Sequence, residues 1–167
     1  RSRTLPTRNE SLASWDLVRR GMYHQYKLTK EDAAQALDYF DQALAVEPES
    51  VEALLQKAWW YFWDTWVHQN TDGWEDMEAL ARQAYGIEPQ DSRASMLMGV
   101  AIMMRDNPFK ARPLLEEAKQ LNPSNAWVYA HLGTSYYLDG EPENAIEPLN
   151  TALQLSPFDL FAFHALG

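Results

Sequence analysis

The chain has 167 residues, with 14 Lys and Arg against 24 Asp and Glu, which gives a formal net charge of −10. A chain this acidic repels the phosphates of nucleic acids and anionic membranes, so we expect neither as a partner. Cysteine is absent, which excludes disulfides, thiol nucleophiles and Cys-ligated metals and leaves the compartment open. No run of about 18 apolar residues occurs, so no membrane-spanning helix is expected.

From about residue 12 onward, the sequence predicts a series of helix pairs. Residues 1–11 include Arg1, Arg3 and Arg8 beside a proline, and we interpret them as a linker or leader. Between residues 125 and 138 the apolar residues follow a helical spacing, and after a polar break at 139–142 a second amphipathic stripe begins near residue 145. The array of 12–167 divides into units at about 14–50, 51–91, 92–125, 126–159 and a partial unit at 160–167.

Several residue types repeat with one period. The prolines that close the units are Pro48, Pro89, Pro123 and Pro157, and the last three are evenly spaced. An alanine stands five residues before each of them: Ala43, Ala84, Ala118 and Ala152. Gly99 and Gly133 are separated by the same interval as the last prolines. Such self-similarity indicates a repeat protein, in which one unit buries its apolar face only by stacking against the next.

The helix ends have recognisable sequence signals. Proline after each second helix cannot continue it, and the next N-caps are expected at Ser50, Asp91, Ser124 and Asp159. Asn107-Pro108 has the pattern of an N-cap followed by a proline in the first turn. Thr29 with Asp32, and Asp72 with Glu75, have the spacing of capping boxes.

The unit that ends at Pro157 resembles a tetratricopeptide repeat (TPR), a helix–turn–helix motif of about 34 residues. Leu132-Gly133, Tyr136, Ala145 and Leu149 sit at the motif's spacing, and the preceding unit matches nearly as well. The resemblance implies an all-α TPR solenoid, a right-handed superhelix of antiparallel helix pairs with about four repeats plus a truncated fifth helix. The second unit departs from the motif through seven extra residues at 67–73.

A looser resemblance concerns the start of the array. The segment from Ser14 to Gly21 is followed by Thr29-x-Glu31-Asp32 and Phe40-x-x-Ala43-Leu44. This pattern is similar to the start of TPR regions in bacterial multidomain signalling proteins. These include class III adenylate and guanylate cyclases and winged-helix TPR regulators. With Arg1 as the first residue and an incomplete last unit, we expect the chain to be a piece of such a protein. Bacterial cytoplasm and periplasm both remain open as compartments.

The sequence offers no support for catalysis. It lacks a P-loop, GxGxxG, GxSxG and HExxH, and its acidic clusters are best explained as solvated helix faces. His68 and Asp72 have the spacing of a metal-ligand pair, but a site needs three or four converging ligands. His131 is expected at the surface or in a groove. We therefore predict no enzymatic activity, no cofactor and no bound metal.

In TPR arrays the first helices line a concave surface. Carried onto this sequence, the resemblance implies a groove rich in Trp, Tyr and Met. Its predicted peptide-binding residues are Tyr26, Leu55, Trp59, Phe62, Trp63, Arg93, Met96, Val100, Met103, Trp127, Thr134 and Tyr137. An aromatic stripe at helical spacing more often fills a core, and we expect Trp60, Tyr61 and Trp66 to do so. Whether Trp59 and Trp63 line the groove or the core stays open at this point.

TPR domains that hold the acidic tails of heat-shock chaperones use a clamp of Lys, Asn and Arg. The matching positions here are without such residues: Val18, Met22, Leu55, Trp59, Met96, Val100, Ala130 and Thr134. We therefore predict a protein–protein interaction scaffold that binds an apolar or aromatic peptide segment. The alternative is a homo-oligomerisation module, such as a homodimer, that packs through the Trp-rich insertion or the helix expected from Phe158 to Gly167.

Overall fold

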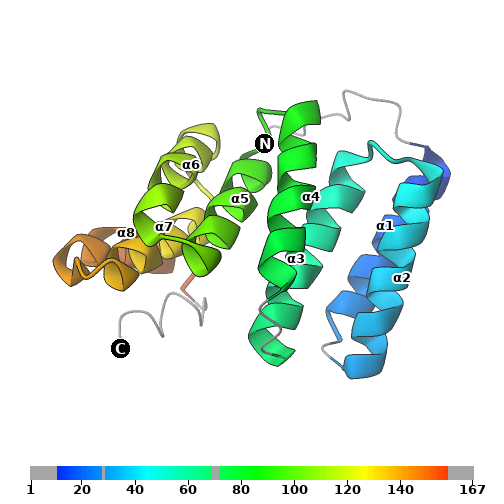
Figure 1. Cartoon of the computed structure of the whole chain (residues 1–167), viewed down its shortest axis with the longest axis horizontal. Coiled ribbons are helices and arrows are strands. Elements are labelled where there is room, and N and C mark those ends of the chain that lie inside the picture. The colour runs from blue at the N-terminus through cyan, green and yellow to red at the C-terminus, as the bar shows by residue number, and fades with distance from the viewer. Residues whose placement is uncertain (1–10, 28, 69–71, 158–167) are drawn as a thin grey trace.

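The structure is a computed structural model that describes residues 11–27, 29–68 and 72–157. Within these ranges every regular element is an α-helix: α1 (Leu12–Gln25), α2 (Lys30–Val46), α3 (Val51–His68), α4 (Gly73–Ile87), α5 (Ser92–Arg105), α6 (Pro108–Leu121), α7 (Ala126–Leu138) and α8 (Pro142–Leu155). Figure 1 shows consecutive helices paired in one row, from α1 and α2 at one end to α7 and α8 at the other. The helix axes turn progressively along this row. The prediction of an all-helical array is confirmed for these residues.

Four predicted helix starts are confirmed by their capping hydrogen bonds, while the predicted cap Asp159 lies outside the described residues. The hydroxyl of Ser50 accepts a bond from the Ala53 N–H at 3.3 Å before α3, and the carboxylate of Asp91 accepts one from the Arg93 N–H at 2.9 Å before α5. The hydroxyl of Thr29 accepts a bond from the Asp32 N–H at 3.1 Å before α2. The side-chain oxygen of Asn107 accepts one from the Phe109 N–H at 2.7 Å before α6, whose first residue is Pro108. All four bonds satisfy donors that have no partner within the helix.

One other predicted start is wrong, and a second is right in position but lacks the predicted capping bond. The cap of α7 is Asn125, which accepts a hydrogen bond from the Trp127 N–H at 3.1 Å, and not Ser124. Asp72 precedes α4 but makes no capping bond with its side chain. Its backbone already has helical angles (φ −71°, ψ −23°), whereas a capping side chain reaches back from an extended backbone.

The second helices all end in the same way. The residue before each closing proline donates its N–H to the carbonyl oxygen of the repeated alanine. These bonds join Glu47 to Ala43 (2.9 Å), Glu88 to Ala84 (2.8 Å), Asn122 to Ala118 (2.9 Å) and Ser156 to Ala152 (2.8 Å). Proline then stops the helix because it has no N–H to donate and its ring clashes with the preceding turn.

Close approach of the two helices in a pair explains the repeated glycines. A Cβ built at Gly133 would lie 2.5 Å from Cγ of Leu149, and one at Gly99 would lie 3.1 Å from Cγ of Leu115. Distances this short are tighter than ordinary van der Waals contact, so glycine lets the second helix pack directly on the backbone of the first.

The buried apolar residues form three clusters that follow one another along the array, the last of them between α7 and α8. The main cluster extends from α3 to α7, and a smaller cluster joins α1, α2 and the start of α3. Ten residues of α5 are buried, because α4 and α6 flank it and α3 and α7 contact it from the neighbouring pairs. The inner face, which is the concave side expected to be lined by the first helices, therefore lies on a buried core.

Candidate functional site

The predicted groove residues differ widely in accessibility. The buried ones are Leu55, Phe62, Met96, Val100 and Met103. The half-buried ones are Trp59, Trp63, Arg93, Trp127 and Thr134. Tyr26 and Tyr137 are exposed and lie near opposite ends of the array, on α1 and α7. The surface available to a partner is therefore smaller than the predicted groove and is richest in tryptophan.

The structure brings aromatic residues from two non-adjacent first helices together. This aromatic cluster contains Trp59, Phe62 and Trp63 of α3 and Trp127 and His131 of α7. The ring centroid of Trp127 lies 5.0 Å from that of Trp59 and 6.2 Å from that of Trp63, in both cases nearly edge to face. Edge-to-face rings at such distances attract one another through their quadrupoles. The curvature of the array is thus tight enough for α3 and α7 to touch across α5.

The methionines of α5 form the layer that supports the aromatic cluster. Met96 and Met103 are each 4% exposed and belong to the main core cluster, against which Trp59, Trp63 and Trp127 pack. The tryptophans of the flanking repeats are large enough to close over the side chains between them. The rings, and not the methionine thioethers, therefore present the surface at this point of the inner face.

Sequence reasoning was wrong about His131 and Trp66. His131 was expected at the surface or in a groove, but it is fully buried against Phe62 and Trp127, with ring centroids 5.7 Å away in both cases. Its burial lowers its pKa to about 3, so it is neutral near pH 7. The signal that could have placed it correctly is Leu97, an apolar residue one period earlier. Trp66 was expected in the core and is 48% exposed, near the end of α3.

The charged group at the edge of the inner face is already engaged within the protein. Arg93 of α5 forms ion pairs with Asp91 at 2.7 Å and with Glu52 of α3 at 2.8 Å. Burial opposes the charge of its guanidinium, but the two carboxylates outweigh this effect and raise the pKa of Arg93. The pair with Glu52 links two successive first helices, and the pair with Asp91 is local to the start of α5. Arg93 therefore holds the array together more than it offers a free cation to a partner.

The described residues contain no group of three or more His, Asp and Glu side chains that could hold a metal ion. The His68 side chain lies outside the described part. No helix among the described residues combines the length and the hydrophobicity needed to cross a bilayer.

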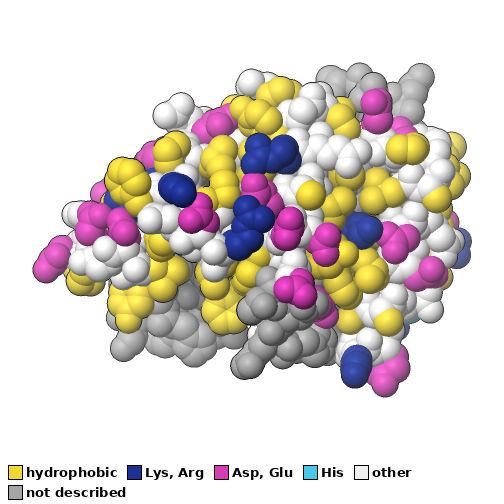
Figure 2. All heavy atoms as spheres, viewed as in Figure 1, with side chains coloured by type: hydrophobic (Ala, Val, Ile, Leu, Met, Phe, Trp, Pro, Cys, Tyr) yellow, Lys and Arg dark blue, Asp and Glu magenta, His cyan; other side chains and the backbone are white. Residues whose placement is uncertain are grey.

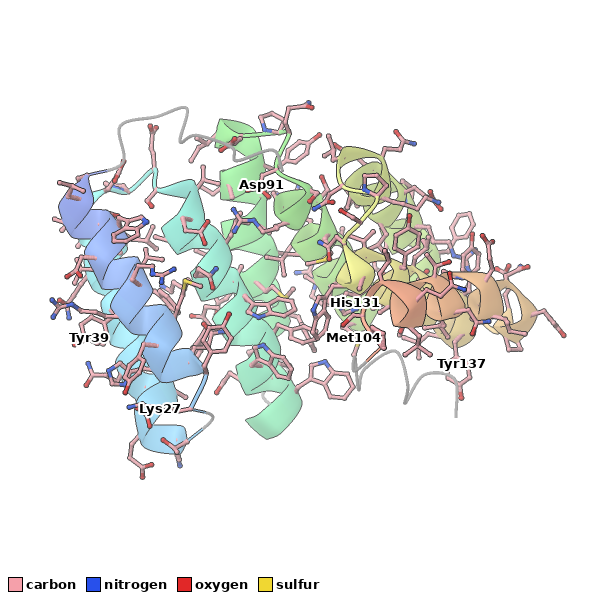
Figure 3. All side chains as sticks on the ribbon, turned by 180° about the vertical axis from the view of Figure 1, so that it is seen from behind. Lys27, Tyr39, Asp91, Met104, His131 and Tyr137 are labelled. Atoms are coloured by element: carbon pink, nitrogen blue, oxygen red, sulfur yellow. The ribbon has the colours of Figure 1, made fainter. Side chains whose placement is uncertain are left out.

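A cavity of about 350 Å³ opens between α6, α7 and α8, and it is lined by Glu116, Lys119, Tyr129, Leu132, Tyr136, Glu143, Asn144, Glu147 and Pro148. This cavity is separate from the aromatic cluster. Figure 3 shows His131 at the centre of the molecule and Tyr137 towards the end formed by α7 and α8.

Comparison with known proteins identifies the fold. No protein-family model matches the chain, and no curated protein sequence matches it. Among solved structures, a crystal structure of MamA is 24% identical with a TM-score of 0.62, covering 86% of this chain and 80% of that one. A thermophilic TPR protein from Thermus thermophilus is 17% identical with a TM-score of 0.58, covering 92% and 97%. A mutant O-GlcNAc transferase from Thermobaculum terrenum is 28% identical with a TM-score of 0.60, covering 70% of this chain but 21% of the transferase.

The chain therefore has the fold of an all-α TPR solenoid. These neighbours agree with the TPR resemblance. They do not test the similarity to the TPR regions of cyclases and winged-helix regulators, which stays a prediction. The division into units at the residues given above also stays a prediction, as does the fifth helix, whose residues lie outside the described part.

Proposed function

We propose that this chain is a non-enzymatic protein–protein interaction scaffold whose inner face binds an apolar or aromatic segment of another protein. The observation that carries the proposal is the aromatic cluster, where half-buried tryptophans from α3 and α7 meet over a buried floor. Aromatic groups concentrated on a rigid, partly desolvated surface are the residues that most often supply binding energy in protein interfaces.

The surroundings of the aromatic cluster favour an apolar partner over an acidic one. Val18, Leu55, Met96 and Val100, at positions that match the carboxylate clamp of chaperone-binding TPR domains, are buried apolar side chains. The nearby cation, Arg93, is paired with two carboxylates. An acidic tail would lose its hydration here without gaining a free positive charge. An amphipathic helix or an extended apolar segment would instead bury its side chains against the rings.

Isothermal titration with two peptides tests this proposal. One is an amphipathic helical peptide with Leu and Trp on one face, and the other is an acidic peptide with a free C-terminal carboxylate. We expect the apolar peptide to bind more tightly, and W63A and W127A each to weaken its binding by about thirtyfold, which corresponds to the loss of about 2 kcal/mol that marks a hot spot. F109A is the matched control, since Phe109 is exposed on the second helix α6. Tighter binding of the acidic peptide, or an equal loss with F109A, would contradict the proposal.

We further propose that residues 12–167 are the regulatory TPR region of a larger bacterial signalling protein, on the strength of the phrase from Ser14 to Gly21. Self-association through the Trp-rich insertion is a second candidate function. It is favoured by Trp66, whose side chain is half exposed next to that insertion. The related alternative, packing through the residues after Pro157, concerns a segment outside the described part.

A further inference from the structure

The cavity between α6, α7 and α8 combines carboxylates with aromatic rings. Its volume of about 350 Å³ is within the range of small-molecule sites. Glu116 lines it from α6, Tyr129 and Tyr136 line it from α7, and Glu143 and Glu147 line it from α8. Figure 2 shows Asp and Glu side chains gathered over the end of the molecule that α6 and α8 form. The cavity thus joins negative charge to aromatic surface in one enclosed space.

This lining is particular to the fourth repeat. One period earlier, the positions of the three glutamates hold Arg82, Phe109 and Pro113, and those of the two tyrosines hold Ser95 and Ile102. The helices α4, α5 and α6 pack together there without any of these carboxylates or phenol rings. The stacking of repeats therefore does not depend on the lining of the cavity, which is free to serve a ligand.

The carboxylates of the cavity outnumber its cations. Lys119 is the one cation among the lining residues, and it pairs with Glu116 at 2.5 Å. The hydrogen bond to Glu116 is the main cause of a raised pKa of Lys119, so its ammonium is charged near pH 7. Glu143 and Glu147 are exposed one turn apart on α8 and have no ion-pair partner among the described residues. Three carboxylates and one ammonium give the lining an excess of negative charge.

The spacing of these carboxylates suits an organic cation better than a metal ion. The described residues contain no group of three or more His, Asp and Glu side chains that could hold a metal. The glutamates therefore surround the cavity without converging on one point. Leu132 and the two tyrosines of α7 line the cavity between them, and an alkyl chain can rest on such a surface while its charged end reaches the carboxylates.

The protein itself holds a guanidinium in this way beside the cavity. The Arg112 guanidinium lies 4.1 Å from the ring centroid of Tyr136 and pairs with Asp139 at 2.6 Å and Glu141 at 2.9 Å. A guanidinium is planar, stacks on aromatic rings and donates to carboxylates from its edge. One ring and two carboxylates therefore suffice to hold such a group in this part of the molecule, and the cavity offers the same types of side chain with two carboxylates unpaired.

We infer that this cavity binds a guanidinium group on an alkyl chain, such as the side chain of an arginine from another protein. The guanidinium would donate to Glu143 and Glu147, and the alkyl chain would lie along the wall formed by Tyr129, Leu132 and Tyr136. The hydroxyl of Tyr129 donates to the carbonyl oxygen of Pro123 at 3.0 Å, which holds its ring in place. Because the aromatic cluster of the inner face shares no residue with the cavity, binding here is independent of the proposed peptide binding.

Nuclear magnetic resonance titration of the ¹⁵N-labelled whole chain at low salt tests this inference. The probes are agmatine, a blocked peptide with a single arginine, and the same peptide with citrulline, which has a similar shape and no charge. We expect the amide signals of Leu132 and Asn144 to shift saturably with both guanidinium probes, with a dissociation constant of about 1 mM. The citrulline peptide should bind at least about tenfold more weakly, because it cannot pair with the carboxylates.

The two guanidinium probes distinguish the sources of the ligand. Tighter binding of the arginine peptide would assign the cavity to a partner protein, since the backbone on either side of the arginine then contributes. Tighter binding of agmatine would assign it to a free guanidinium compound. Both results support the inferred chemistry.

E143Q/E147Q removes the two unpaired carboxylates and should weaken binding of the arginine peptide by about tenfold. E75Q/E88Q is the matched control, because it changes the net charge equally at exposed positions and Glu75 has the place of Glu143 in the first turn of α4. Far-ultraviolet circular dichroism of both variants should show unchanged helicity. E143Q/E147Q should also bind the apolar peptide of the inner face as before, so this inference and the proposed function can fail separately.

Three results would overturn the inference. They are the absence of saturable shifts with both guanidinium probes, equal binding of the citrulline peptide, and an equal loss of binding in E143Q/E147Q and E75Q/E88Q. The last of these would show that the probes respond to the net charge of the chain and not to the cavity.

Discussion

The third and fourth repeats are each joined to the preceding repeat by an ion pair, and the two pairs have the same geometry with the positive and negative side chains exchanged. In α4, the carboxylate of Glu78 accepts a hydrogen bond from Arg105 of α5 at 2.6 Å. In α6, the guanidinium of Arg112 donates to Asp139, just after α7, also at 2.6 Å. Glu78 and Arg112 are one repeat period apart, as are Arg105 and Asp139. The third and fourth repeats thus each join the one before through an ion pair at the same place, with the sign reversed between the two junctions.

Each of the two central charges has a second partner, and these partners differ in exposure. Glu78 also pairs with Arg82, whose side chain is 65% exposed, and Arg112 also pairs with Glu141, which is 38% exposed. The Arg112 guanidinium lies 4.1 Å from the ring centroid of Tyr136 as well. The junction between α6 and α7 is therefore drier than the junction between α4 and α5, and its charges interact with less screening by water.

The reversal shows that this place between repeats accepts an ion pair in either orientation. It also discourages incorrect order. If α4 packed against the fourth repeat, Glu78 would meet Asp139, and two like charges at close range are unfavourable. The array can therefore use charge to specify which repeat follows which, while the hydrophobic contacts alone would allow more than one order.

Reversing the charge of Arg112, at the drier junction between α6 and α7, should have the largest effect on stability. R112E places a carboxylate against Asp139 and Glu141 and removes the cation from Tyr136, so we expect the free energy of unfolding to fall by about 3 kcal/mol. E78R should lower it by about 1 kcal/mol, because its partners are more exposed. Urea unfolding followed by circular dichroism at room temperature measures both values.

The double variant R112E/D139R restores one opposite-charge pair and should recover part of the lost stability. K110E, an exposed charge reversal on the same helix, should change the free energy of unfolding by less than about 0.5 kcal/mol. Equal losses for R112E and E78R would show that water screens the charges equally at the two junctions, and would contradict the greater dryness of the junction between α6 and α7.

Lowering the pH should reduce the stability of the protein through His131 of the fourth repeat, whereas its counterpart in the third repeat, Leu97, carries no titratable group. Burial lowers the pKa of His131 to about 3, below the value of about 6.5 expected in the unfolded chain. Between these two values the unfolded chain binds more protons, so stability is complete above a pH of about 6.5 and falls as the pH drops towards about 3. The expected loss is about 1.4 kcal/mol for each pH unit in this window.

H131L copies the residue of the third repeat and should remove this contribution. Urea unfolding of both proteins at pH 7 and pH 4.5 should show a stability difference that changes by about 2 to 3 kcal/mol in favour of the variant at the lower pH. Parallel pH profiles for the two proteins would mean that His131 accepts a proton without unfolding, and would contradict its burial.

The glycines of the two repeats should respond differently to alanine. A Cβ at Gly133 would come within 2.5 Å of Leu149, whereas one at Gly99 would stay 3.1 Å from Leu115. We expect G133A to destabilise by about 2 kcal/mol through overpacking. G99A requires a smaller shift, and the higher helix propensity of alanine offsets part of its cost. Thermal unfolding of the two variants compares them directly, and a loss for G99A equal to or greater than that for G133A would contradict the expected difference in packing.

Local signals in the sequence were sufficient for most helix ends. Thr29 and Asn107 were identified as caps because their side-chain types and the following residues satisfy the backbone locally. Closing prolines such as Pro123 were equally reliable, because proline lacks an N–H whatever surrounds it. Asp72 makes no capping bond because its backbone already has helical angles, which the type of its side chain does not reveal.

The inner face could be predicted less well. The TPR resemblance placed Trp59, Trp63 and Trp127 on the inner side of their helices, but their contact with one another depends on the curvature of the array. The same curvature decides that Met96 is buried and that His131 is inside. Helical spacing specifies the direction in which a side chain points from its own helix axis. It carries no information about the distance to the repeat after the next.

The amino-acid sequence by itself determined the repeat, the pairing of helices and the places where each helix stops, because these depend on contacts within a single repeat period. Tertiary structure alone decided which apolar side chains remain accessible and which charges are shielded from water. Those properties arise from the angle between successive repeats, a sum of many small packing contacts that no single residue specifies.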